Sequence, residues 1–103
     1  MALVYSVSVS LGVEDADEWL AWMRDTHLQR VMVTGCFTGY RLHKLIAPAE
    51  DITLVTFNVQ YQCADREAYD RYQREHAPRL QAESREAFGD RAHAFRSLLE
   101  LLD

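Results

Sequence analysis

Residues 65–88, DREAYDRYQREHAPRLQAESREAF, form the stretch that decides the fold. At about 100° per residue, an α-helix through this stretch has one mostly apolar face. The side chains on that face are Tyr69, Tyr72, His76, Leu80 and Ala87. Pro78 lacks an N–H donor and crowds the preceding turn, which predicts a bend in the helix. A titratable histidine within a packing face is the feature that bears most directly on function.

A strand and a helix are predicted before this stretch. Residues 3–11 alternate between apolar and mostly serine side chains, the pattern of a β-strand with one apolar side, and Gly12 ends it. Residues 13–35 then show a helical pattern, with a capping-box start at Asp15 and Glu18 and an end at Gly35. The predicted packing face of this helix consists of Ala16, Trp19, Leu20, Met23, His27 and Val31.

Three further strands complete the pattern. Residues 36–46 and 52–62 read as strands joined by the short turn 47–51, which has the length of a hairpin connection. Gly89 and Asp90 end the long helix, and residues 93–102 form the last predicted strand. One side of that strand carries Phe95, Leu99 and Leu101, and the other carries Arg96 and Glu100.

The order of these elements is strand–helix–strand followed by strand–helix–strand. Two such units joined by a hairpin give the ferredoxin-like βαββαβ sandwich, an α+β fold with a four-stranded antiparallel sheet and two helices on one face. A chain of 103 residues predicts one domain, residues 1–103. The two halves repeat with an offset of 49 residues, which places His27 and His76 at equivalent positions of the two helices.

Two helices cover only one face of such a sheet. The other face is predicted to carry mostly polar side chains together with Leu54 and Leu98. The polar set is Ser6, Ser8, Ser10, Thr56, Asn58, Gln60, Arg96 and Glu100. A second copy packed sheet against sheet covers this face and closes an eight-stranded barrel about a two-fold axis. We therefore expect a homodimer through the open sheet face, the dimeric α/β barrel arrangement.

Composition and charge exclude several classes of function. The net charge is −5, and acidic and basic residues are mixed along both helices, which argues against a nucleic-acid or anionic-membrane surface. Apolar runs are too short for a bilayer span, and the N-terminus begins in a strand pattern without a basic leader, so we expect a cytoplasmic protein. Cys36 and Cys63 are expected to be buried free thiols. We expect no metal and no cofactor, because no phosphate loop or paired-cysteine motif occurs.

The candidate ligand-binding residues are histidines and tyrosines near the predicted interface between helices and sheet: His27, Tyr40, Tyr61, Tyr69, Tyr72 and His76. A histidine among tyrosines can act as a general acid or base near neutral pH. Each imidazole could instead be structural, bonding to a helix end or to a backbone carbonyl in the core. Two histidines without a third ligand at suitable spacing give little support for zinc.

Arg41 is a further candidate, because an arginine inside a pocket can bind a ligand carboxylate through two N–H donors. The favoured alternative is an ion pair between Arg41 and Glu83 or Glu100. Trp19 and Trp22 lie at helical spacing, which is typical of core packing rather than of cofactor stacking.

Three segments resemble a known bacterial family, the domain of unknown function 4286. They are residues 17–23 with the sequence DEWLAWM, residues 34–41 with TGCFTGYR and, above all, residues 69–83 with YDRYQREHAPRLQAE. His27 and residues 94–100 extend the resemblance over nearly the whole chain. The resemblance implies a dimeric α/β-barrel fold and a small cytoplasmic protein. It implies no activity, because the family has none assigned.

More distantly, the topology is similar to that of the antibiotic-biosynthesis monooxygenases and haem-degrading enzymes. That similarity implies a substrate pocket between sheet and helices, and a histidine of the second helix that can ligate haem iron. His76 lies in the matching region. The Asn and Trp that accompany this histidine in the haem-degrading enzymes have no counterparts here.

Two functional hypotheses follow. The first is a non-catalytic, homodimeric small-molecule-binding or regulatory module. Its pocket between helices and sheet would be lined by His27, Tyr61, Tyr69, Tyr72 and His76. The alternative is a cofactor-independent or haem-linked monooxygenase-type enzyme in which His76 is the base or the axial ligand.

Overall fold

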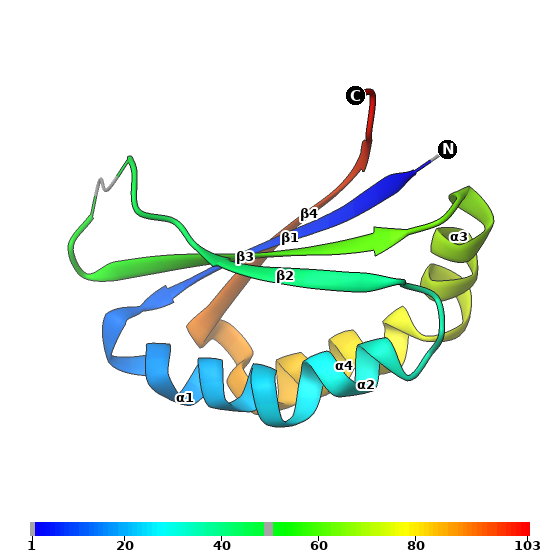
Figure 1. The fold of residues 1–103 in the computed structure, drawn as a ribbon. Helices are drawn as coiled ribbons and strands as arrows, with labels where there is room; N and C mark the ends of the chain where they lie inside the picture. The colour runs from blue at the N-terminus through cyan, green and yellow to red at the C-terminus, as the bar shows by residue number, and fades with distance from the viewer. Residues whose placement is uncertain (1, 49–50) are drawn as a thin grey trace.

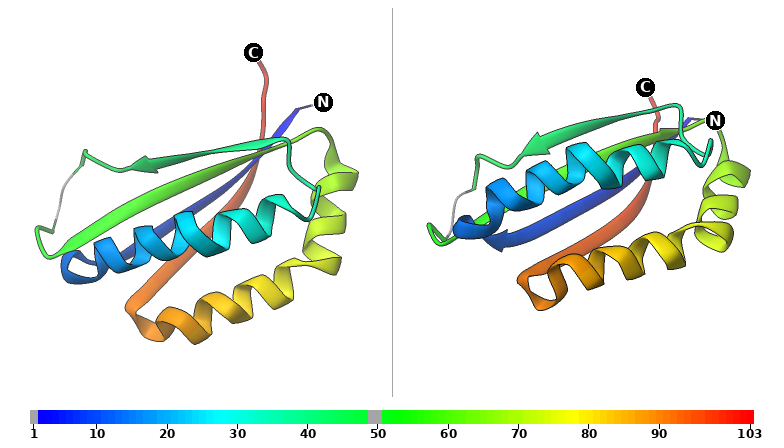
Figure 2. Two further views of the ribbon diagram at one scale, coloured as in Figure 1. Left: turned by 60° about the horizontal axis from the view of Figure 1, so that its bottom comes forward. Right: turned by 90° about the horizontal axis from the view of Figure 1, so that it is seen from below.

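The computed structural model describes residues 2–48 and 51–103. Within this part of the chain, four strands form one antiparallel sheet in the order β2-β3-β1-β4. The strands are β1 (Leu3–Gly12), β2 (Gly39–Lys44), β3 (Leu54–Cys63) and β4 (Ala92–Glu100). Figure 1 and Figure 2 show the helices on one side of this sheet and the other side uncovered. The predicted ferredoxin-like βαββαβ fold is confirmed.

Helical segments follow β1 and β3. The first helical segment comprises the 3-10 turn η1 (Val13–Asp15), α1 (Ala16–Trp22), the π-helical turn η2 (Met23–His27) and α2 (Leu28–Met32). The second comprises α3 (Arg66–Glu75), α4 (Ala77–Phe88) and the 3-10 turn η3 (Gly89–Arg91). Gly35 follows α2 with φ of 75°, so the predicted glycine stop is confirmed. The predicted turn 47–51 contains residues 49 and 50, which lie outside the described residues.

The π-helical turn η2 changes the predicted packing face of the first helix. Trp19 and Met23 are buried as predicted, but the next buried residue is Leu28, five positions after Met23. A π-helical turn produces this spacing because its hydrogen bonds span five residues rather than four. The predicted capping box is wrong, because Asp15 lies in a 3-10 turn with helical backbone angles and makes no capping hydrogen bond. Its carboxylate accepts a hydrogen bond of 3.0 Å from Arg91 Nη1 instead.

The predicted helix 65–88 is two helices rather than one bent helix. Asp65 caps α3, its carboxylate accepting a hydrogen bond of 2.9 Å from the Ala68 N–H. His76, with φ of −126° and ψ of −38°, separates α3 from α4. Pro78 cannot donate to a preceding turn, so the helix ends and starts again at Ala77. The proline then lies in the first turn of α4, where no N–H donor is required.

The core lies between the sheet and the helices. The largest fully buried side chains come from strands and helices alike: Leu11, Leu28, Val31, Val59 and Leu80. The ring of Tyr5 lies within 6.0 Å, centroid to centroid, of the rings of four other aromatic residues, which are Phe37, Tyr61, Tyr69 and Tyr72. Cys36 and Cys63 are buried free thiols, as expected.

The last strand presents the opposite sides to those predicted. In the register with β1, Arg96, Leu98 and Glu100 fall on the side of the sheet that the helices cover, so their predicted place on the open face is wrong. Phe95 and Leu99 lie on the open face instead. Both sides of this strand carry apolar residues, so the alternating pattern alone does not determine which side faces the core.

The open face carries the predicted short polar side chains, and they bond to one another. Ser10 Oγ and Thr56 Oγ1 are 2.7 Å apart. Asn58 Nδ2 donates to Ser6 Oγ and to Ser8 Oγ, each at 3.0 Å. Because these groups already have partners within the sheet, another surface can cover them at a small desolvation cost.

Candidate functional site

A cavity of about 220 Å³ lies between the helices and the sheet. Its walls come from β1, β3 and β4 on one side and from α1, η2, α3 and α4 on the other. Much of the lining is apolar: Val7, Val9, Trp19, Met23, Val59, Leu80 and Phe88. The space exceeds what a single water molecule needs. An apolar lining with a few polar groups is typical of sites for small molecules.

The cavity opens between α4 and the edge strand β4. The exposed residues of its lining all belong to this region of the chain: Arg85, Gly89, Ala94 and Arg96. Val7 lies on the central strand β1, yet it is only partly buried because it faces this space. The site therefore has a buried apolar interior and a charged mouth.

His27 brings a titratable group into the cavity wall. Its imidazole stacks on Trp22, with ring centroids 4.8 Å apart, and its buried Nδ1 has no hydrogen-bond partner within residues 2–48 and 51–103. Burial lowers the pKa of His27 from 6.5 to about 4, and the charges of Arg30 and Arg96 add to this effect while Glu83 opposes it. The ring is neutral at physiological pH, and Nδ1 can donate or accept a hydrogen bond according to its tautomer.

Three tyrosines reach the cavity from β1, β3 and α3: Tyr5, Tyr61 and Tyr72. Burial raises the pKa of each phenol, and the positive charge of Arg96 opposes that rise in all three. Arg96 belongs to the same cavity lining as these three tyrosines. The tyrosines therefore supply neutral hydroxyls to the cavity, and Arg96 supplies a positive charge.

The cavity brings together three of the predicted site residues, His27, Tyr61 and Tyr72, which belong to its lining. They come from η2, β3 and α3, so their proximity depends on the tertiary fold rather than on sequence spacing. The π-helical turn is the local feature that places His27 here. Such turns occur frequently at functional sites.

Tyr69 and His76 do not line the cavity, although both were predicted in the same pocket as His27. Tyr69 packs edge-on against Tyr5, with ring centroids 5.5 Å apart. His76 occupies the junction between α3 and α4, its ring centroid 6.3 Å from that of Tyr72, and its buried Nδ1 also lacks a partner in the described residues. The helix break moves His76 out of the regular packing face. A ligand-binding role for these two residues stays a prediction.

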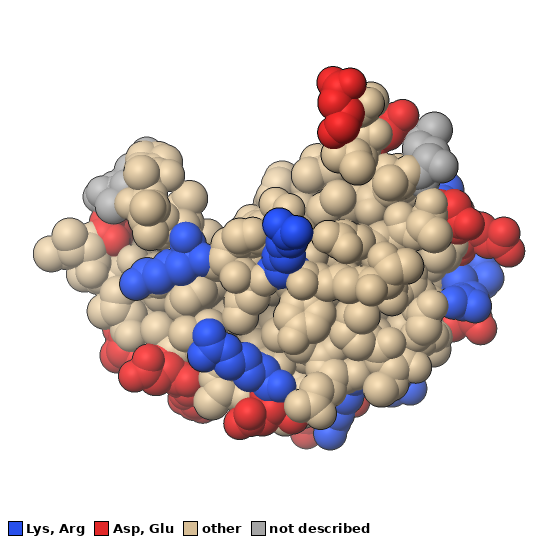
Figure 3. Space-filling model, viewed as in Figure 1, with Lys and Arg blue, Asp and Glu red and all other residues tan. Residues whose placement is uncertain are grey.

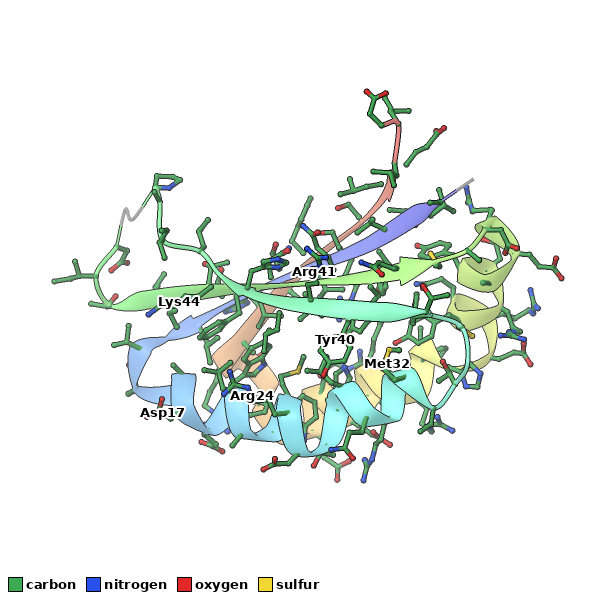
Figure 4. All side chains as sticks on the ribbon, in the orientation of Figure 1. Asp17, Arg24, Met32, Tyr40, Arg41 and Lys44 are labelled. Carbon is green, nitrogen blue, oxygen red and sulfur yellow. The ribbon has the colours of Figure 1, made fainter. Side chains whose placement is uncertain are left out.

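Tyr40 and Arg41 are neighbours on β2 and point to opposite sides of the sheet, as Figure 4 shows. Tyr40 faces the helices, its ring centroid 6.4 Å from that of Tyr61, but it lies outside the cavity lining. Arg41 lies on the open face, and among the described residues it forms neither of the predicted ion pairs. Glu83 binds Arg30 Nη1 instead, at 2.9 Å.

Arg85 and Arg96 are the charged cavity residues that sequence reasoning missed as site residues. Arg96 was assigned to the open face through the ambiguous alternation of the last strand. Ala92, Ala94 and Leu98 lie on the same side of the strand as Arg96. Because these three residues are uncharged, they could have indicated that this side faces the helices. Arg85 lies beside the apolar face of α4, where a helical projection could have placed it at the rim.

Residues 2–48 and 51–103 contain no group of three or more His, Cys, Asp or Glu side chains that could hold a metal ion. Among the described helices, none is both long enough and apolar enough to cross a membrane.

Acid is expected to destabilise the protein through His27. Its pKa is lowered from 6.5 to about 4 on folding, so the unfolded chain binds more protons and stability falls as the pH drops from 6.5 towards 4. The loss attributable to this group is about 3 kcal/mol. Urea unfolding at pH 7 and at pH 4 measures it, with His27→Gln as the reference protein. Parallel pH dependence of the two proteins would contradict this assignment.

The fold and the cavity together define a ferredoxin-like α+β protein with an internal site between its helices and its sheet. The chain belongs to the family described as "Domain of unknown function (DUF4286)", which matches residues 2–102. Among proteins with curated descriptions, none matches the chain.

Solved structures share the fold at low sequence identity. HapK from Hahella chejuensis is 17% identical with a TM-score of 0.68, the match covering 99% of this chain and 93% of that one. SnoaB, a cofactor-independent oxygenase from Streptomyces nogalater, is 12% identical with a TM-score of 0.68, covering 99% and 94%. A dimeric ferredoxin-like protein from an uncultured marine organism is 10% identical with a TM-score of 0.58, covering 100% and 98%. At these identities the similarity establishes the fold alone.

Proposed function

We propose that this protein is a small-molecule-binding module and that the cavity between its helices and its sheet is the binding site. The observation that carries the proposal is an unfilled space of about 220 Å³, lined by apolar side chains together with His27, whose buried Nδ1 has no hydrogen-bond partner in the described residues. Protein interiors normally pack densely, and an internal space lowers stability unless something fills it. A buried polar atom without a partner is a second cost to stability.

A homodimer through the open sheet face is part of this proposal. Phe95 is 72% exposed and Leu99 is 45% exposed on that face, beside polar groups that already bond to one another. In Figure 3 the surface above the sheet is hollowed between the β2–β3 hairpin and the C-terminal end, and it is mostly uncharged. A second copy offers the same mostly uncharged surface, on which Arg41 also lies, and would cover both apolar side chains. The neighbour described as a dimeric ferredoxin-like protein supports a dimer.

Filling the cavity tests the binding site. Val7 lines it and is only partly buried, so Val7→Phe is expected to occupy the space with an aromatic ring. The probe is 2-naphthylmethanol, a neutral aromatic molecule, and isothermal titration calorimetry measures its binding. We expect the wild-type protein to bind it and Val7→Phe to bind at least about tenfold more weakly, with the melting temperature kept or raised.

The matched control is Val33→Phe, which makes the same change at a position that is 83% exposed and outside the lining. It is expected to bind like the wild type. Equal binding by Val7→Phe and wild type would contradict the cavity as the site. A wild-type protein that binds neither 2-naphthylmethanol nor its acid, 2-naphthoate, would reject the proposed function.

An enzymatic function is the second candidate. The imidazole of His27, which lines the cavity together with Tyr61 and Tyr72, would be the general base, and its lowered pKa of about 4 restricts it to substrates whose proton is itself acidic. In this cavity the base would be His27, because His76 is not in the lining.

The haem-linked form of this candidate has a separate test. Adding haemin and recording the Soret band detects axial ligation, and His76→Ala and His27→Ala assign the ligand. A shifted band that His76→Ala abolishes would support His76 as the axial ligand. An unchanged band in the wild-type protein would reject haem ligation.

A further inference from the structure

The mouth of the cavity carries two arginines that have no acidic partner. Arg85 lies on α4 and Arg96 lies on β4, on the two sides of the opening. Within residues 2–48 and 51–103, neither forms an ion pair. Four other arginines do form ion pairs: Arg30, Arg66, Arg74 and Arg91. Four further arginines of the described residues, Arg24, Arg41, Arg71 and Arg79, also form no ion pair. What distinguishes Arg85 and Arg96 is that both line the same opening.

The rest of the lining reinforces this positive charge. Among the described residues, the lining contains neither aspartate nor glutamate. Gln81 and Ser84, on the same helix as Arg85, add uncharged hydrogen-bonding groups. An anion at the mouth would meet guanidinium groups from two elements, and no carboxylate of the lining would repel it. A cationic ligand would meet repulsion there.

The interior favours a flat ring system. Aromatic side chains enter it from the sheet and from both helical segments: Trp19, Tyr61, Tyr72 and Phe88. Aromatic faces and edges bind a flat ring through offset-stacked and edge-to-face contacts. The ring stacks already present, such as Trp19 on Phe57 with centroids 5.0 Å apart, show that flat groups pack well in this core.

We infer that the ligand is a small aromatic acid, with its ring system in the cavity interior and its carboxylate at the mouth between Arg85 and Arg96. This inference rests on the proposed binding function of the cavity. A guanidinium matches a carboxylate geometrically, because two parallel N–H donors can bind its two oxygens. Both arginines are exposed, so solvent screens the attraction and the selectivity for the acid is moderate rather than large.

The test compares 2-naphthoate with 2-naphthylmethanol, two molecules with the same ring and nearly the same size. Calorimetric titration of the wild-type protein at pH 7 is expected to give about tenfold tighter binding of the acid. Arg96→Gln is expected to remove most of this preference, because it weakens binding of the acid much more than binding of the alcohol. Arg79→Gln is the matched control, since Arg79 is an exposed arginine of α4 that lies outside the lining.

The outcomes separate this inference from the proposed function. Equal wild-type affinities for the acid and the alcohol, both reduced by Val7→Phe, would overturn the aromatic-acid inference while the cavity remained the binding site. A preference for the acid that survives both Arg96→Gln and Arg85→Gln would also overturn it. Loss of the preference in Arg96→Gln but not in Arg79→Gln would establish the role of the mouth.

Discussion

Replacing Leu80 with alanine is expected to lower the free energy of unfolding by about 2–5 kcal/mol. Leu80 has 0% of its surface exposed and lies on α4 against the sheet, where it also forms part of the cavity wall. Truncation removes buried methyl groups and enlarges a space that is already present, so the surrounding side chains have little chance to close over it. Urea unfolding followed by circular dichroism at pH 7 measures the change.

Val33→Ala is the control, because Val33 is 83% exposed and truncation there is expected to change the free energy of unfolding by less than about 0.5 kcal/mol. A loss below about 1 kcal/mol in Leu80→Ala would contradict the packing of α4 against the sheet. That packing forms one wall of the site, so the cavity itself would then be in doubt.

Replacing Phe95 with aspartate is expected to convert a dimer into a monomer of 11.9 kDa. Phe95 is 72% exposed on the open face, and in the proposed dimer its ring is covered by the partner. The substitution would place an unpaired carboxylate, and its two-fold copy, in a surface that excludes water. Light scattering coupled to size exclusion at micromolar concentration measures the mass of each protein.

Val33→Asp makes the same kind of change at an exposed position beyond the C-terminal end of α2, away from the open face, and is expected to keep the dimer mass. A monomeric wild-type protein would contradict the proposed interface. So would a Phe95→Asp variant that stays dimeric.

The fold could be predicted because several local signals agree. Alternation in residues 3–11 and helical spacing in residues 65–88 gave the element types, and their order gave the ferredoxin-like topology. Glycine at position 35 predicted the end of the first helix correctly. The capping box at Asp15 failed because a 3-10 turn precedes the α-helix there, which sequence spacing does not reveal.

The site was less predictable because a change of one residue in a helix or strand decides which side chains face the cavity. One extra residue in η2 moves His27 to the end of a π-helical turn, where it reaches the cavity. His76, at the equivalent position by sequence offset, lies at a helix break and does not. Arg96 reaches the cavity because the last strand has two apolar phases, and only its pairing with β1 decides which one faces the helices.

A crystal structure of the full chain grown with 2-naphthoate would show whether the cavity between the helices and the sheet holds a small molecule. We expect a ring system inside the cavity, in contact with Trp19 and Tyr72, and a carboxylate bonded to the Arg96 guanidinium. A closed cavity in which the imidazole of His27 bonds to the protein, or naphthoate bound only on the outer surface, would show that the cavity is not the binding site.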